Sequence, residues 1–126
     1  MVKLPWGRLL QEASTNVTTI PVQGEETVYT EALDIRLISD LALEYQLAGD
    51  VGQRKLSITF EQGDTAASLV ALEGGSVINA ELIDTDKHVV AVPKTSAKYG
   101  RIKLIGLSGN NQNTTITLRL TGISSH

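Results

Sequence analysis

The stretch YGRIKLIGLSGNNQNTTITLRLTGI, residues 99–123, contains two runs of alternating apolar and polar residues on either side of a polar segment. Ile116, Leu118 and Leu120 alternate with threonine and arginine, which is the two-residue period of a half-buried strand. The segment SGNNQN between the runs has the glycine and asparagine residues that close turns. The stretch therefore predicts two strands joined by a polar turn, and it contains no acid, histidine or cysteine.

The same two-residue period recurs along the rest of the chain. Strong patterns lie at residues 33–37, 41–47 and 55–60, and weaker ones lie at residues 17–22, 77–83, 88–92 and 101–107. About eight short strands with turn signals between them predict an all-β fold, a single-domain antiparallel sandwich that is jelly-roll-like, rather than an α/β fold. The segment TAASLVALEG, residues 65–74, fits either a strand or one helical turn.

The chain of 126 residues has the length of one domain. It has no cysteine and two histidines, so disulfides, thiolate metal sites and a histidine-built zinc site are not expected. The N-terminal segment lacks the apolar run of a signal peptide, and no apolar run approaches the length of about 18 residues that a membrane span needs. We therefore expect a protein without cofactor, metal or membrane span that is made and kept soluble in a cytoplasm.

Residues 1–14 differ from the remainder of the chain and are predicted to form an N-terminal arm before a β-sandwich domain at residues 15–126. Trp6, Leu9 and Leu10 concentrate apolar side chains in this arm, ahead of the first strand pattern. The arm either folds back over one open end of the sandwich or reaches a neighbouring subunit, because tryptophan is a frequent anchor at interfaces. These three residues are therefore candidates for partner binding.

A metal site has one weak candidate, the segment DTDKH at residues 84–88. On a strand, Asp84, Asp86 and His88 would point to one face. The segment also falls between two strand patterns, where aspartate is expected for its local hydrogen bonds, and this turn interpretation is favoured. The sequence has no Gly-x-Ser-x-Gly motif, phosphate loop or dinucleotide fingerprint, so we predict that the protein is not an enzyme.

Composition disfavours two classes of binding protein. Sugar-binding sandwiches stack sugar rings on exposed aromatic residues, and only Trp6, Tyr29 and Tyr99 remain for this role in a chain with 4% aromatic residues. A carbohydrate-binding module is therefore a minor alternative. Single-stranded nucleic acid binding needs a basic groove with interleaved aromatic residues, whereas the net charge is −3, so no nucleic-acid partner is expected.

Charge is unevenly distributed along the chain. All 14 acidic residues lie between residues 12 and 86, and the first 86 residues, which include five basic ones, sum to −9. Residues 87–126 contain six basic residues and no acid, and sum to +6. One interpretation is that basic strands pair beside acidic strands within the sheets, where opposite charges stabilise each other slightly. The other is that the two parts form opposite faces, which favours head-to-tail association of subunits.

Strands and short turns follow one another in the segments LALEYQLAGD, RKLSITFEQGD, KTSAKYGRIKLIGLSGN and TTITLRLTGI, with an Arg-Ile-Lys strand near the end. This pattern, which covers roughly residues 33–123, resembles that of small all-β virion proteins of tailed bacteriophages. The segment MVKLPWGRLL does not align with the pattern, so the resemblance leaves the mode of capsid attachment undefined.

The resemblance implies a head decoration (cement) protein with a jelly-roll-like sandwich. Such a protein binds the outer surface of the assembled capsid and stabilises it, often as a trimer. The implied partners are the major capsid protein lattice and further copies of this chain, and the implied location is the exterior of the virion. The family has no catalytic residues. A small tail, baseplate or adaptor protein of the virion is the alternative.

Three basic residues near the end of the chain complete the candidate partner-binding set. Arg101 and Lys103 lie two apart in a strand pattern, so both point to one face while Ile102 and Leu104 point to the other. Arg119 lies among the threonines of the last strand, and the three are expected to belong to one weakly basic surface. Charges at an interface edge mainly set the association rate. Replacing Arg101 and Lys103 by glutamate is therefore expected to change stability by less than about 1 kcal/mol.

Overall fold

The structure, a computed structural model, describes residues 17–30, 32–36, 38–49, 55–71, 77–82, 84–92 and 96–124. These residues form ten strands and no helix, which confirms the predicted all-β class. The strands are β1 (Val17–Pro21), β2 (Thr27–Tyr29), β3 (Leu33–Asp34), β4 (Ile38–Ala48), β5 (Leu56–Gly63), β6 (Val70–Ala71), β7 (Val77–Leu82), β8 (His88–Ala91), β9 (Tyr99–Gly106) and β10 (Thr115–Ser124). Eight of them have three residues or more, in line with the predicted number, and β3 and β6 have two.

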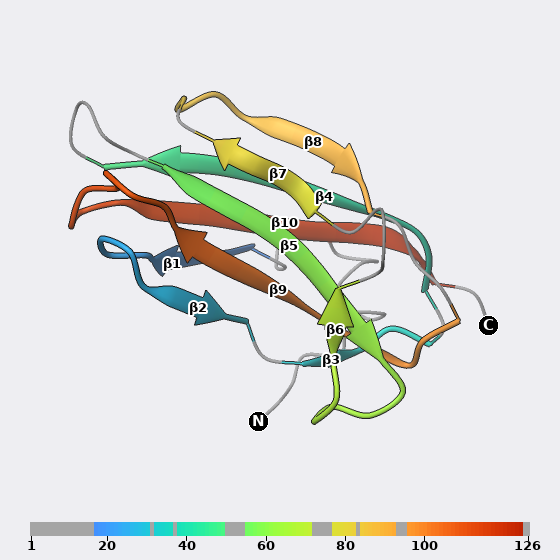
Figure 1. Cartoon of the computed structure of the whole chain (residues 1–126). Coiled ribbons are helices and arrows are strands. Elements are labelled where there is room, and N and C mark those ends of the chain that lie inside the picture. The colour runs from blue at the N-terminus through green and yellow to red at the C-terminus, as the bar shows by residue number, and fades with distance from the viewer. Residues whose placement is uncertain are drawn as a thin grey trace.

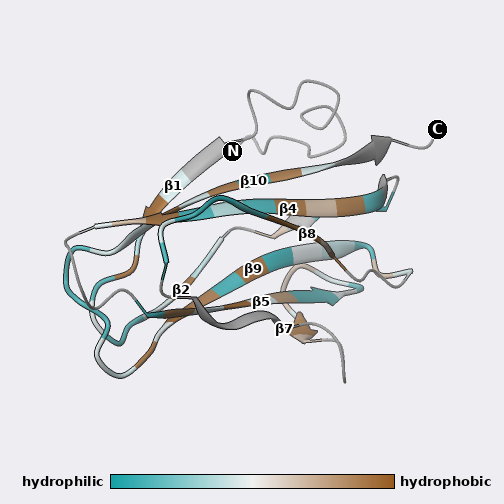
Figure 2. Cartoon of the chain, turned by 90° about the horizontal axis from the view of Figure 1, so that it is seen from above, coloured by the Kyte–Doolittle hydropathy of each residue, from teal (hydrophilic) through white to brown (hydrophobic). Residues whose placement is uncertain are grey.

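The strands form two antiparallel sheets that lie one on the other (Figures 1 and 2). The first, which we call the β4 sheet, has the order β1-β10-β4-β8. In the second, the β5 sheet, β9 and β5 are central; β2 and β3 pair in succession along β9, and β7 and β6 pair along β5. Without the two-residue strands, its order is β2-β9-β5-β7, and most connections cross from one sheet to the other. This wrapping is a jelly roll, as the sequence predicts.

The apolar residues of the alternating patterns fill the space between the sheets. Figure 2 shows apolar positions along the central strands of both layers. The core cluster consists of Val22, Ile35, Leu41, Leu43, Tyr45, Leu47, Leu56, Ile58, Phe60, Val92, Ile102, Leu104, Ile116, Leu118 and Leu120. Burying one such leucine or isoleucine side chain contributes about 2 kcal/mol, so this cluster is the main source of stability.

The structure corrects the strand prediction at one place and adds a strand at another. The alternation at residues 33–37 predicts a full strand, but β3 ends at Asp34. Ile35 is nevertheless buried, and its backbone N–H donates to the Lys98 carbonyl oxygen at 2.8 Å. The alternation here therefore reflects packing against the core and does not require a long run of paired strand residues. The short strand β2 has no clear sequence period and was not predicted. Of residues 65–74, Thr65–Ser68 form a turn closed by the Ser68 N–H donating to the Thr65 carbonyl oxygen, Val70–Ala71 form β6, and residues 72–74 lie outside the described residues.

The polar segment between β9 and β10 does not close a hairpin, because the two strands lie in different sheets. Asn110 anchors this crossing with four hydrogen bonds and is 7% exposed. Its side-chain amide donates to the carbonyl oxygens of Val22 at 3.0 Å and Gly24 at 2.7 Å. Its oxygen accepts from the Lys55 backbone N–H at 2.9 Å and from the Thr114 hydroxyl at 2.8 Å. One side chain thus joins the segment after β1, the residue before β5 and the segment after β9. The end of β1, the start of β5 and the end of β9 lie at the same end of the sandwich (Figure 1).

Close backbone packing at this end requires a glycine at the end of β9. A Cβ atom on Gly106 would lie 1.8 Å from the carbonyl oxygen of Gly24, the same oxygen that Asn110 binds. The Gly106 backbone N–H also donates to the Glu26 carbonyl oxygen at 2.9 Å. The turn after β1 is therefore held against β9 by backbone and side-chain contacts together.

The predicted N-terminal arm, residues 1–14, lies outside the described residues. Within the described ranges, no helix is long and apolar enough to cross a membrane.

Candidate functional site

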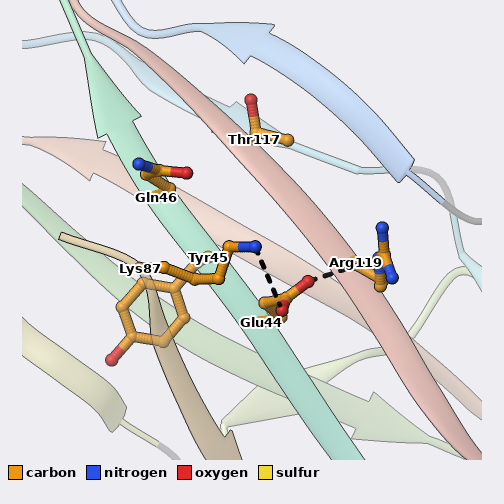
Figure 3. Close-up of a pocket in the computed structure, with 6 residues that line it drawn as sticks. All are labelled: Glu44, Tyr45, Gln46, Lys87, Thr117 and Arg119. Atoms are coloured by element: carbon orange, nitrogen blue, oxygen red, sulfur yellow. Dashed lines mark ion pairs between the residues drawn. The ribbon is translucent and has the colours of Figure 1, made fainter. Parts of the chain in front are cut away.

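A shallow hollow of about 100 Å³ lies on the outer face of the β4 sheet. It is built by neighbouring positions of β4 and β10, because the alternation that buries Leu43 and Tyr45 points Glu44 outward. Arg119 is the register partner of Glu44 across the two strands, and Thr117 is that of Gln46. Lys87 enters from the segment before β8. The residues that line the hollow are Glu44, Tyr45, Gln46, Lys87, Thr117 and Arg119 (Figure 3).

The Glu44 carboxylate lies between two cations in this hollow (Figure 3). Its Oε1 atom is 3.3 Å from Arg119 Nε, and its Oε2 atom is 3.8 Å from Lys87 Nζ. Arg119 Nε is buried and makes no hydrogen bond with the residues that the structure describes, although the contact with Glu44 is close enough for an ion pair. Lys87 and Arg119 thus share the Glu44 carboxylate through two long contacts.

Threonine, glutamine and valine side chains lie beside the charged groups of the hollow. The hydroxyl groups of Thr19 and Thr117 are hydrogen-bonded at 3.0 Å between β1 and β10. The Gln46 side-chain amide donates to the Thr85 carbonyl oxygen at 3.1 Å. Val89, the register partner of Glu44 on β8, is 67% exposed. An apolar side chain therefore stands directly beside the charged group.

A second cluster lies on the outer face of the β5 sheet. Arg101 Nε donates to Glu61 Oε1 at 2.7 Å, and only 9% of the Glu61 side chain is exposed. The Arg101 guanidinium lies over the Tyr29 ring, 4.1 Å from its centre, and Lys103 Nζ lies 5.9 Å from that centre. Tyr29 is 46% exposed, but Arg101 occupies a face of its ring that sugar stacking would use.

The structure separates the three basic residues that the sequence assigned to one surface. Arg101 and Lys103 share a face while Ile102 and Leu104 are buried, as predicted. Arg119 lies on the other sheet and faces the opposite side of the sandwich. The prediction of one basic surface is therefore wrong, because the chain changes sheets between β9 and β10. Trp6, Leu9 and Leu10 of the candidate set lie outside the described residues.

The charges of the acidic and basic parts of the chain are interleaved. β9 pairs with β5, which places Arg101 opposite Glu61, and β10 pairs with β4, which places Arg119 opposite Glu44. The interpretation with basic strands beside acidic ones is confirmed for these strands. The alternative of an acidic face opposite a basic face is wrong there, so charge segregation no longer supports head-to-tail association.

The segment at residues 84–88 forms the expected turn before β8. Asp84 Oδ1 accepts hydrogen bonds from the Asp86 backbone N–H at 2.9 Å and from His88 Nε2 at 2.8 Å. The His88 ring stacks on Tyr45, with 5.2 Å between ring centres and 15° between planes. Within the described ranges, no group of three or more histidine, aspartate or glutamate residues is arranged to hold a metal ion.

This turn predicts a pH dependence of stability. The hydrogen bonds from His88 and from the Asp86 backbone lower the pKa of the Asp84 carboxyl group below its usual range. A carboxyl group with a lowered pKa stabilises the folded state above its unfolded pKa, and this contribution is lost as the pH falls through the folded pKa. We expect wild type to be more stable than Asp84→Asn at neutral pH, with a difference that shrinks below about pH 4. Urea denaturation of both proteins at neutral and acidic pH measures this, and a pH-independent difference would contradict it.

Sequence reasoning missed the central residues of the hollow. Glu44 and Gln46 were predicted only as the polar phase of a strand, and Lys87 only as part of a turn. Their proximity to Arg119 depends on which strands are neighbours and in which register, and a single alternating pattern carries neither piece of information.

Comparisons with known proteins show the fold. No protein-family model and no curated protein matches the sequence. The structure is similar to the crystal structure of PirA, with a TM-score of 0.56, 11% identity, and coverage of 83% of this chain and 93% of PirA. It is also similar to part of a chain in infectious bursal disease virus, Gx strain, with a TM-score of 0.52, 12% identity, and coverage of 86% of this chain and 32% of the viral chain. At these identities, the likeness is one of fold.

Proposed function

We propose that this protein is a non-enzymatic structural protein of a virion that binds the outer surface of the assembled capsid and stabilises it. The observation that carries the proposal is the outer face of the β4 sheet, where a charged hollow and the exposed Val89 lie side by side on neighbouring strands. A surface with an apolar residue beside charged groups suits contact with another protein. Its residues on β4, β8 and β10 are held by the sheet, so little ordering of their backbone is needed when a partner binds.

The fold and the state of the acidic groups support this proposal. A jelly roll is common in viral capsid proteins, and part of a chain of infectious bursal disease virus has a similar fold. The carboxylates of Asp34, Glu44, Glu61 and Asp84 each lie in an ion pair with a neighbouring side chain. The oxygen atoms of these four side chains are therefore engaged by neighbouring residues of the same chain.

The proposed partner is the major capsid protein lattice, and the proposed assembly is a trimer on the capsid exterior. Both follow from the resemblance to phage decoration proteins. A tail, baseplate or adaptor protein of the virion is the alternative, and it differs in the structure to which the protein attaches.

The test is binding to virus heads that were assembled without this protein. We expect it to sediment with such heads, to saturate at a fixed ratio to the capsid protein, and to raise their melting temperature. Light scattering of the free protein and density on the labelled heads report the number of copies in each assembly. Attachment to tails and not to heads would establish the alternative, and retention on a glycan array without attachment to either would overturn both.

A further inference from the structure

We propose that the hollow between Lys87 and Arg119 receives a carboxylate side chain of the partner protein, and that Glu44 occupies this position while the partner is absent. The inference rests on the proposed function, since the partner is the protein on which the outer face of the β4 sheet docks. It states which chemical group of that partner the hollow binds.

The charges of the hollow favour the binding of a carboxylate from the partner protein. Lys87 and Arg119 provide two cations, and Glu44 is the one acid among the lining residues. Its contacts of 3.3 Å and 3.8 Å are longer than the 2.7–2.9 Å that is typical of charge-assisted hydrogen bonds. Among the described residues, Arg119 Nε is buried without a hydrogen-bond partner, although a guanidinium group is well suited to bind a carboxylate through two parallel bonds. The cations are therefore held in place but incompletely satisfied.

The surroundings favour a carboxylate on a protein over a free anion. Val89 is 67% exposed beside Glu44, and the neighbouring register pair on β4 and β8 is Ala42 and Ala91. These side chains offer apolar contact next to the charges, a combination found at protein interfaces. A small anion would use only the charges, whereas an acidic residue on a protein surface would also cover Val89.

In the cluster on the β5 sheet, by contrast, the arginine already has close partners. Arg101 donates to Glu61 at 2.7 Å and lies 4.1 Å from the centre of the Tyr29 ring. Its Nε atom is thus already bound to a nearly buried acid. Lys103, on the same face, takes part in no ion pair within the described residues and provides a matched control for the removal of one positive charge.

The first test uses a capped peptide with three glutamate residues and a glutamine counterpart, followed through the backbone amide signals in NMR. We expect the glutamate peptide to shift the signals of Glu44, Val89 and Arg119, and the glutamine peptide to leave them unchanged. Arg119→Gln is expected to weaken binding about tenfold, and Lys87→Gln about threefold. Lys103→Gln is expected to bind as wild type does.

Glu44→Gln distinguishes this proposal from a purely structural role of the cluster. Because it removes the internal competitor, we expect it to bind the glutamate peptide about threefold more tightly. If these side chains only support the fold, the substitution lowers stability without improving binding. Weaker or unchanged peptide binding by folded Glu44→Gln, or an equal loss in Lys87→Gln and Lys103→Gln, would overturn the inference.

The second test repeats the sedimentation with virus heads. Arg119→Gln is expected to bind them at least about tenfold more weakly than wild type, while Lys103→Gln binds normally. If wild type and Arg119→Gln bind heads equally well, the inference is wrong and the proposed function stands. If wild type does not bind heads but the peptide results hold, the proposed function is wrong and the carboxylate site belongs to another protein partner.

Discussion

Replacing Asn110 by alanine is expected to lower the free energy of unfolding by about 3 kcal/mol or more, because four partners lose their hydrogen bonds at a buried position. Each buried polar group that is left unsatisfied costs about 1–3 kcal/mol. The groups affected are the carbonyl oxygens of Val22 and Gly24, the Lys55 N–H and the Thr114 hydroxyl. Against a total stability of about 5–15 kcal/mol for a small domain, this loss brings the protein close to unfolding.

Urea denaturation followed by circular dichroism measures this effect. Asn110→Asp is expected to be destabilised as well, because a carboxylate cannot donate to the two carbonyl oxygens. Gln112→Ala, an exposed substitution in the same connection, is the control and should change stability by less than about 0.5 kcal/mol. Similar unfolding midpoints for Asn110→Ala and Gln112→Ala would show that the connection does not depend on this side chain.

Replacing Arg101 by glutamate is expected to cost about 3 kcal/mol, which revises the loss of less than about 1 kcal/mol that the sequence suggests. The substitution removes the partner of Glu61, whose side chain is only 9% exposed, and places a second carboxylate opposite it. Breaking a buried pair by removing one member leaves the other charge uncompensated. It also removes the guanidinium that covers the Tyr29 ring.

Lys103→Glu is the matched control, because it makes the same change of charge on the same face. Lys103 lies within 5.9 Å of the Tyr29 ring centre but not beside Glu61, so its replacement should cost less than about 1 kcal/mol. Thermal and urea denaturation of both variants provide the comparison. Equal and small losses would mean that Arg101 and Glu61 behave as a solvated surface pair.

The sequence predicts well which residues face the core and poorly which strands meet. Alternation located β4, β5, β9 and β10, because a period of two needs only one buried face. It also placed Arg101 and Lys103 on one face correctly. It failed for Arg119, because the residues between β9 and β10 have the composition of a tight turn whether they close a hairpin or cross to the other sheet.

Asn110 shows the same limit at the level of a single residue. Within SGNNQN, it resembles its neighbour Asn111, and both are typical of turns. Its role depends on backbone groups at Val22, Gly24 and Lys55, which are distant in the sequence. The hollow has a similar origin, since Glu44 and Lys87 meet Arg119 only after three strands have taken their places.

The distribution of strand lengths has a consequence for behaviour at high concentration. The inner strands β4, β10, β5 and β9 have 11, 10, 8 and 8 residues, whereas each described strand at an outer edge has six or fewer. Pro21 at the end of β1 also has no N–H to donate. Short, interrupted edges offer few consecutive backbone groups to a strand from another molecule. We therefore expect crowded copies to resist strand exchange and growth into amyloid-like fibres.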